Sequence, residues 1–262
     1  MEELWDLILY NFVGCLIVFA RVTGIFTFNP IFGRQNLPMR ARVMMSIAIT
    51  VCMLAAMGGT THYVPPSIIA FVGVLILEAL LGFAFGFFMH LVMTTLLYAG
   101  EITDNKMGLM MANVMDPGSG IQAAVFANFY TYLFLIYFFV TNSHIQYIRL
   151  FALSYSIIPV GFQVTLNTHE IIYHIIQFFG TSLELALKLA MPILAAGMIT
   201  EISVGIIMKA VPAIQVFILS IPLKIILGLF MVLSLVRVIS WFIDKLFDTM
   251  WANLEIIMYR FV

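Results

Sequence analysis

The feature that most constrains this chain is an apolar run from Ile68 to Ala99, in which Glu78 and His90 are the only acidic or basic side chains. As an α-helix, this run would be about 48 Å long, whereas the hydrocarbon core of a bilayer is about 30 Å thick. Such a helix must tilt, bend or lie partly outside lipid. Gly82 and Gly86 form a Gly-x-x-x-Gly face on it, which permits close approach of another helix.

The composition limits the protein to a membrane class. Of the 262 residues, 63% are hydrophobic and only 10% are charged, and the mean hydropathy is +1.09. This leaves too little polar surface to cover a water-soluble globule, so we expect an all-α membrane protein. The net charge of -1 and the scattered Lys and Arg side chains exclude a nucleic-acid partner. Cys15 and Cys52 lie in apolar runs, where free cysteines behave as small hydrophobic residues.

Together with the run from Ile68 to Ala99, further apolar segments predict six or so helices, several of the wrong length for a simple membrane span. Polar or proline-containing breaks are expected at 141–144 and 159–168, and a kink is expected at Pro192, which lacks a backbone donor. The segments are 7–28, 43–57, 123–140, 145–158, 169–208 and a last helix over 223–251.

The stretch from Gly100 to Gln122 is the polar, glycine-containing segment between these apolar halves. It carries four methionines within nine residues, Met107, Met110, Met111 and Met115. Methionine packs without demanding one shape, so the stretch suits either a surface that closes around changing partners or an irregular core. We divide the chain at this stretch and at the break over 159–168 into four regions, residues 1–99, 100–122, 123–168 and 169–262.

No catalytic or metal-binding motif is predicted, and therefore no cofactor. His169 and His174 flank a glutamate but are five residues apart, which places them about 140° apart around a helix, so they cannot share one metal ion. Ser119 lies in a Pro-Gly-Ser-Gly turn that lacks the first glycine of a nucleophile elbow, and no histidine is placed beside it. We expect no enzyme.

Ionisable side chains inside apolar helices are costly and usually pair or face an aqueous path. They are Glu78, Glu184, Lys188, Glu201, Lys209 and Lys224. Glu184 and Lys188 have the i,i+4 spacing of a helical ion pair. Two functions remain open: an ion relay in a small-molecule secondary transporter, centred on Glu78 and Glu201, or salt bridges between subunits of a membrane assembly. The overlong helices favour the assembly, because subunits that cover one another need not match the bilayer thickness.

Short motifs along nearly the whole chain carry a family resemblance. They are Arg21 to Pro30 (RVTGIFTFNP), Leu37 to Arg40 (LPMR), Ala99 to Ile102 (AGEI), Met107 to Leu109 (MGL), Asp116-Pro117, Asn142 to His144 (NSH), Val211 to Phe217 (VPAIQVF) and Ile221 to Lys224 (IPLK). In this order and spacing the chain resembles the FliR family of the bacterial flagellar type III export gate, and more distantly its counterparts in virulence type III secretion.

The resemblance implies long kinked helices in helical hairpins, similar to a fused FliP and FliQ, within a multi-subunit gate. Residues 1–99 would be FliP-like, 123–168 the middle helices and 169–262 a FliQ-like hairpin. The implied partners are FliP, FliQ, FlhB and FlhA homologues and unfolded flagellar export substrates. The implied location is the flagellar basal body in the bacterial inner membrane, partly raised above the bilayer.

The resemblance also implies roles for particular residues, with no covalent chemistry. A loop after the long third helix would plug the export channel, and its matching residues are Met107, Gly108, Met110, Met111, Met115, Asp116, Pro117, Gly118 and Gly120. Packing and salt bridges between helices or subunits would involve Gly82, Gly86, Glu184, Lys188, Glu201 and Lys224.

Overall fold

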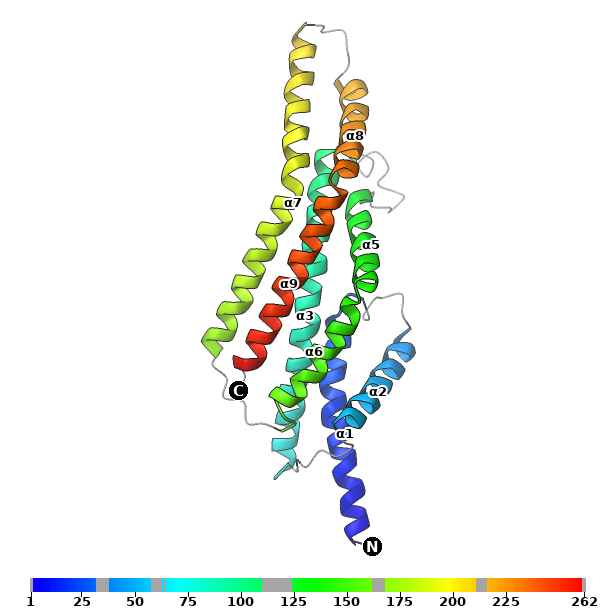
Figure 1. Cartoon of the computed structure of the whole chain (residues 1–262), viewed down its shortest axis with the longest axis vertical. Coiled ribbons are helices and arrows are strands. Elements are labelled where there is room, and N and C mark those ends of the chain that lie inside the picture. Colours follow the sequence, from blue (N-terminus) through cyan, green and yellow to red (C-terminus); the bar gives the residue numbers. More distant parts are fainter. Residues whose placement is uncertain are drawn as a thin grey trace. The chain divides into compact units, whose positions relative to one another are not determined.

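The computed structural model describes residues 2–31, 38–57, 63, 65–109, 124–161, 168–210 and 216–260. Over these residues the regular structure is helical throughout, with no strand (Figure 1). The expected all-α class is therefore confirmed. The helices are α1 (Glu2–Phe28), α2 (Met39–Ala56), α3 (Ile68–Lys106), α5 (Val125–Val140), α6 (Ser143–Ile157), α7 (Thr168–Ala210), α8 (Val216–Ser234) and α9 (Val236–Arg260).

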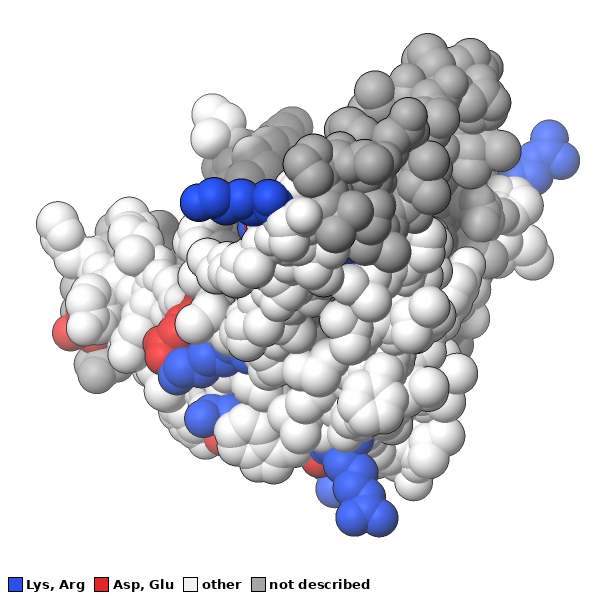
Figure 2. Space-filling model, turned by 90° about the horizontal axis from the view of Figure 1, so that it is seen from above, with Lys and Arg blue, Asp and Glu red and all other residues white. Residues whose placement is uncertain are grey.

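Several of these helices are long and apolar enough to cross a membrane. Among the described residues, three helices qualify alone: Met39–Ala56, Ile68–Lys106 and His169–Ala210. Up to five spans result if α5 with α6, and α8 with α9, each count as one broken span. Large hydrophobic side chains are exposed along these helices, and the face drawn in Figure 2 is mostly uncharged. These features are those of a membrane protein.

The chain forms two compact units, each assembled from separate stretches. Unit 1 comprises Met1–Leu91, Asn142–Ile176 and Met250–Val262, and unit 2 comprises Val92–Thr141 and Gln177–Thr249. The core of unit 1 contains Phe85, whose ring meets Tyr147 and Phe151 edge-on. The core of unit 2 contains a stack of Phe134, Phe138 and Phe247, whose ring centroids are 5.4 to 6.1 Å apart.

Two expected breaks occur where the sequence places them. The chain between α5 and α6 passes through Asn142, whose φ of 58° is left-handed, a conformation that asparagine tolerates better than most residues. Pro192 lies inside α7, and Figure 1 shows this helix changing direction in its middle part.

Two expected helix boundaries are wrong. Helix α3 continues past Ala99 to Lys106, so the first residues of the central stretch are helical. The expected last helix over 223–251 is two helices, α8 and α9, with a bend of 61° between them. Pro222 does not begin a helix but is the seventh residue of α8, and the break at Leu235 carries no glycine or proline that would indicate it.

Candidate functional site

The central stretch leaves α3 through a well-defined helix end in unit 2. Gly108 has a φ of 76°, and its N–H donates to the carbonyl oxygen of Asn105 at 3.1 Å. The N–H of Leu109 donates to the carbonyl oxygen of Asp104, also at 3.1 Å. These two bonds form a Schellman motif, in which a glycine takes the left-handed position after the helix. Gly108, expected in the plug, therefore ends α3.

The side chain of the same Asp104 binds the beginning of α5. Its Oδ1 accepts a hydrogen bond from the N–H of Phe126 at 2.9 Å, and its Oδ2 accepts from the N–H of Ala127 at 3.1 Å. The first N–H groups of a helix have no partner within the helix, and a negative charge there is favoured by the helix dipole. Ala124, the residue at the start of α5, makes no side-chain cap. Asp104 therefore supplies the cap from another helix.

Two further contacts hold the end of α3 against the start of α5. A Cβ atom placed on Gly100 would lie 2.5 Å from the nitrogen of Ala127, so only glycine allows this approach of the two backbones. The side chains of Thr103 and Tyr130 are hydrogen-bonded to each other, and both are almost fully buried. We call residues 99–109 and 124–131 the base of the central segment.

Met107 lies inside unit 2, with 2% of its surface exposed. Its side chain fills the space beside Gly228 of α8, where an added Cβ would meet the Met107 Cγ at 2.8 Å. Met107 also lines a small pocket together with Lys106, Gly197 and Lys224. In this conformation Met107 is a packing residue of the base. The other expected plug residues lie outside the described residues; they are Met110, Met111, Met115, Asp116, Pro117, Gly118 and Gly120.

The expected ion pairs of unit 2 are placed as follows. Lys224 of α8 donates to Glu201 of α7 at 2.8 Å, with 16% and 45% of the two side chains exposed. Lys224 also lines the pocket beside Met107. Lys188 pairs with Glu184 one turn away on α7, where both side chains are more than half exposed.

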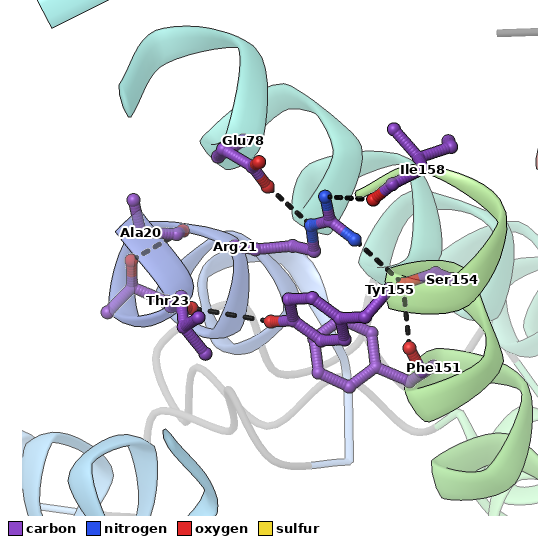
Figure 3. Close-up of polar contacts among 9 residues, drawn as sticks. Ala20, Arg21, Thr23, Glu78, Phe151, Ser154, Tyr155 and Ile158 are labelled. Carbon is purple, nitrogen blue, oxygen red and sulfur yellow. Dashed lines mark hydrogen bonds and ion pairs between the residues drawn. The ribbon is translucent and has the colours of Figure 1, made fainter. Parts of the chain in front are cut away.

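Unit 1 contains a buried polar cluster around Arg21, which is fully buried in α1. Its Nε donates to Glu78 of α3, its Nη1 donates to Ser154 Oγ of α6 at 3.2 Å and its Nη2 donates to the carbonyl oxygen of Ile158 at 3.0 Å (Figure 3). The guanidinium also lies 4.1 Å from the ring centroid of Tyr155, a cation–π contact.

This cluster was only partly predictable from the sequence. Arg21 and Glu78 carry opposite charges inside apolar segments, and such residues usually pair. Glu78 was expected as a candidate ion-relay group, whereas Arg21 was noted only as the first residue of a family motif. Nothing in their spacing of 57 residues identifies them as partners.

The α1–α3 contact beside the cluster is a contact of glycines. A Cβ atom on Gly82 would collide with the backbone carbonyl of Arg21, and one on Gly86 would lie 2.8 Å from the carbonyl oxygen of Ile25. Gly24 of α1 meets the backbone of α3 in the same way. The Gly-x-x-x-Gly face of α3 therefore packs on α1 within unit 1, and Gly24 is a participant that no sequence pattern indicated.

Neither unit offers an arrangement typical of a metal centre in its described residues, where no three His, Cys, Asp or Glu side chains lie together. The polar groups of both sites face other protein groups: Asp104 faces backbone N–H groups, and Arg21 faces a carboxylate, a hydroxyl and a carbonyl. These arrangements hold helices together.

Known proteins resemble this chain over most of its length. A family model described as "Bacterial export proteins, family 1" matches residues 12–250. Flagellar biosynthetic protein FliR of Bacillus subtilis (strain 168) is 26% identical over 241 residues, which cover 90% of this chain and 91% of the relative. The protein of the same name from Caulobacter vibrioides is 28% identical over 213 residues, covering 81% and 84%, and that from Escherichia coli K12 is 25% identical over 229 residues, covering 87% and 86%. The chain therefore belongs to the bacterial export proteins, family 1, the family of flagellar biosynthetic protein FliR.

Proposed function

We propose that this protein, a component of the bacterial flagellar type III export apparatus, is a structural and gating subunit of the export channel. It lines and closes a pore for unfolded flagellar substrates and carries out no covalent chemistry of its own. The observation that carries the gating role is the base of the central segment: α3 ends and α5 begins at one place, joined through Asp104. The segment between them, residues 110–123, contains Met110, Met111 and Met115.

A connection whose two ends meet on a packed base is suited to a local closing role, because it can change without unfolding the helices on either side. Methionine side chains suit a closure that must adapt to an unfolded chain and still exclude water, because they pack in many shapes without a charge. Met110, Met111, Met115, Asp116, Pro117, Gly118 and Gly120 would form this closure.

The same proposal covers the assembly of this protein with other subunits. The 39-residue helix α3 would be about 58 Å long, well beyond the roughly 30 Å of a hydrocarbon core. Neighbouring subunits can cover the apolar surface that lipid does not reach. We propose that FliP and FliQ homologues do so in the bacterial inner membrane, with FlhB and FlhA homologues nearby in the flagellar basal body and part of the complex raised above the bilayer.

The transporter alternative has less support. It depends on Glu78 and Glu201 as groups that bind and release a proton or ion. Glu78 is bound by the buried Arg21, and Glu201 is bound by Lys224. Both carboxylates therefore already have a cation partner, and each pair is formed within its own unit.

The test is to replace residues 110–120 by a glycine-serine linker of equal length. The replacement begins after Leu109, so the hydrogen bonds that end α3 remain. Ion conductance is then measured across lipid bilayers that contain the gate reconstituted with FliP and FliQ homologues. We expect the variant gate to leak small ions at rest and the wild-type gate to stay closed.

The matched control replaces residues 162–167, another connection between two helices, with the same type of linker, and it should leave the resting conductance unchanged. The amounts of co-purified FliP and FliQ homologues are measured for each variant, so that failed assembly is not mistaken for closure. If an assembled gate stays closed without residues 110–120, these residues do not plug the channel.

A further inference from the structure

The exposed face of α3 changes its chemistry along the helix. In the part that belongs to unit 1, its most exposed large side chains are all apolar; they are Ile68, Ile69, Val72, Ile76 and Leu80. In the part that belongs to unit 2, Thr94, Tyr98, Glu101 and Asn105 are partly or fully exposed. Their spacings of four, three and four residues put them on one face of the helix. We call these four residues the polar stripe of α3.

The polar stripe points away from the packed side of α3. Ala99 and Thr103 are buried in unit 2 with at most 1% of their surface exposed, and they lie about half a turn around the helix from the stripe. Within the described part of the chain, the Glu101 carboxylate has no cation partner. By contrast, the exposed carboxylates of Glu184 and Glu201 each bind a lysine. The stripe therefore carries a charge that unit 2 does not neutralise.

The surroundings of the stripe in unit 2 are apolar. Helix α7 passes the end of α3 at Gly197, where Met198 and Ile199 are exposed, and α5 exposes Val125 and Phe129 where it begins. If bulk water covered this whole end of unit 2, these large apolar side chains would all face it. A polar and ionisable face is equally unsuited to lipid. The stripe therefore needs water on its own side only.

We propose that the polar stripe of α3 lines the water-filled path of the export channel and contacts the unfolded chain that passes through it. The hydroxyl and carboxamide groups of Thr94, Tyr98 and Asn105 can exchange hydrogen bonds with water and with the peptide groups of any sequence. Glu101 adds one negative charge to the wall. The inference rests on the pore-lining part of the proposed function, and it does not depend on which residues close the pore.

The first experiment tests for water at the stripe by cysteine labelling. Cys15 and Cys52 are changed to Ala, and a single cysteine replaces Thr94 or Tyr98. A charged thiol reagent that cannot cross lipid is added on both sides of membranes that contain the gate assembled with FliP and FliQ homologues. The reagent reacts with the thiolate, which is disfavoured in apolar surroundings. We expect both positions to be labelled, about tenfold or more faster than the control.

The matched control is Tyr132→Cys. Tyr132 is a tyrosine of α5 in the same unit, with 58% of its surface exposed compared with 46% for Tyr98, but Phe129 and Ile136 on its helix face are apolar. Equal labelling of Tyr98→Cys and Tyr132→Cys in the assembled gate would overturn the inference. Labelling of Tyr98→Cys that occurs in the isolated chain and is lost on assembly would also overturn it, because a subunit would then cover the stripe. Thr94→Cys decides the result if Tyr98→Cys fails to assemble.

The second experiment separates a channel lining from a surface in bulk water. A photo-crosslinking amino acid replaces Tyr98, and in a second chain Tyr132, in cells that contain the complete export apparatus. An unfolded flagellar substrate is stalled during export by a folded domain fused to its end. We expect cross-links to the stalled substrate from position 98 and none from position 132. Labelling at Tyr98→Cys without such cross-links would place the stripe in bulk water and overturn the inference.

The outcomes distinguish this inference from the proposed plug. If the linker variant of residues 110–120 leaks ions but position 98 neither labels nor cross-links, the inference is overturned and the plug is kept. If position 98 labels and cross-links in the wild-type gate while the linker variant stays closed, the lining is kept and the plug is lost.

Discussion

The buried cluster of unit 1 allows a quantitative test of what holds α1, α3 and α6 together. In Arg21→Met the guanidinium is lost, and the Glu78 carboxylate stays buried with 4% of its surface exposed. Removing one partner of a buried ion pair costs about 3–5 kcal/mol, because the other charge is left uncompensated. In Glu78→Gln, the buried Arg21 charge loses its counter-ion, so the same range of about 3–5 kcal/mol applies; we expect the cost at its lower end, because Arg21 keeps its bonds to Ser154 and Ile158 and the amide oxygen of glutamine can still accept a hydrogen bond.

The double variant Arg21→Met/Glu78→Met separates the charge from the packing. It leaves the Ile158 carbonyl without its donor, at about 1–3 kcal/mol. Ser154 stays satisfied because its hydroxyl donates to the Phe151 carbonyl at 2.6 Å. Two apolar side chains of suitable size leave no buried charge, and such replacements are often neutral or stabilising. We expect the double variant to unfold more easily than wild type but less easily than Arg21→Met alone.

The assay is a denaturant titration of the full-length chain in detergent, followed by the fluorescence of Trp251. This side chain is buried in unit 1, with its ring centroid 6.2 Å from that of Tyr147. Trp5 and Trp241 are first changed to Phe so that Trp251 is the only tryptophan left.

The control for this series is Arg149→Met, because Arg149 is exposed on α6 of the same unit, and we expect it to change stability by less than about 0.5 kcal/mol. The reasoning is refuted if the double variant loses at least as much stability as the sum of the single losses from Arg21→Met and Glu78→Met, since the pair would then have no coupling.

Three further predictions concern unit 2, each measured as the free energy of unfolding of the chain in detergent. Gly100→Ala forces the backbones of α3 and α5 apart and should destabilise the base by more than the roughly 1 kcal/mol that alanine gains over glycine in a helix. Met107→Ala should cost about 2–5 kcal/mol as a large-to-small change in a core, and adding Gly228→Ala should recover part of it, because the new methyl group occupies the vacated space. Glu201→Lys or Lys224→Glu should each weaken the α7–α8 contact by about 0.2–1 kcal/mol, and the two together should restore it.

Each of these three has an outcome that would contradict it. Gly180 lies on α7 with nothing near its missing Cβ, so Gly180→Ala should be neutral or stabilising. An equal response of Gly100 and Gly180 would show that close backbone approach is not what requires glycine. If the losses of stability from Met107→Ala and Gly228→Ala add strictly, the two residues do not pack as a pair. If the double charge swap does not recover the stability, Glu201 and Lys224 do not form a stabilising ion pair.

The class and most helices were predictable, because apolar length and helix-breaking residues are local properties of a sequence. Asn142 is an example. An asparagine in a polar break between apolar runs is typical of a turn, and asparagine tolerates the left-handed conformation that it adopts there. Boundaries were less predictable where no special residue marks them, as at Leu235. Gly100 looked like the start of a loop, yet it lies inside α3, since its role is set by Ala127 and not by its own neighbours.

The polar contacts that define both sites were not predictable from spacing. Asp104 lies within the polar stretch from Gly100 to Gln122, and its partners are backbone N–H groups that any residue other than proline offers. No sequence pattern marks such an acceptor, because its donors are backbone N–H groups, which do not depend on the residue type. Met107 was expected in the plug with the other methionines, but the space beside Gly228 keeps it inside unit 2. Residues that act through backbone groups are therefore found only once the fold is known.

The two buried polar sites differ in the kind of group that holds each buried charge. Arg21 is held by a carboxylate, a hydroxyl, a carbonyl and an aromatic ring, so separating α1 from α3 and α6 means breaking several contacts and exposing two opposite charges to an apolar interior. The Asp104 carboxylate is held by backbone N–H groups of α5, and a single neutralising proton or a small shift of α5 weakens all of these bonds together. The Arg21 cluster therefore joins groups of α1, α3 and α6, whereas Asp104 joins α3 to the backbone of α5.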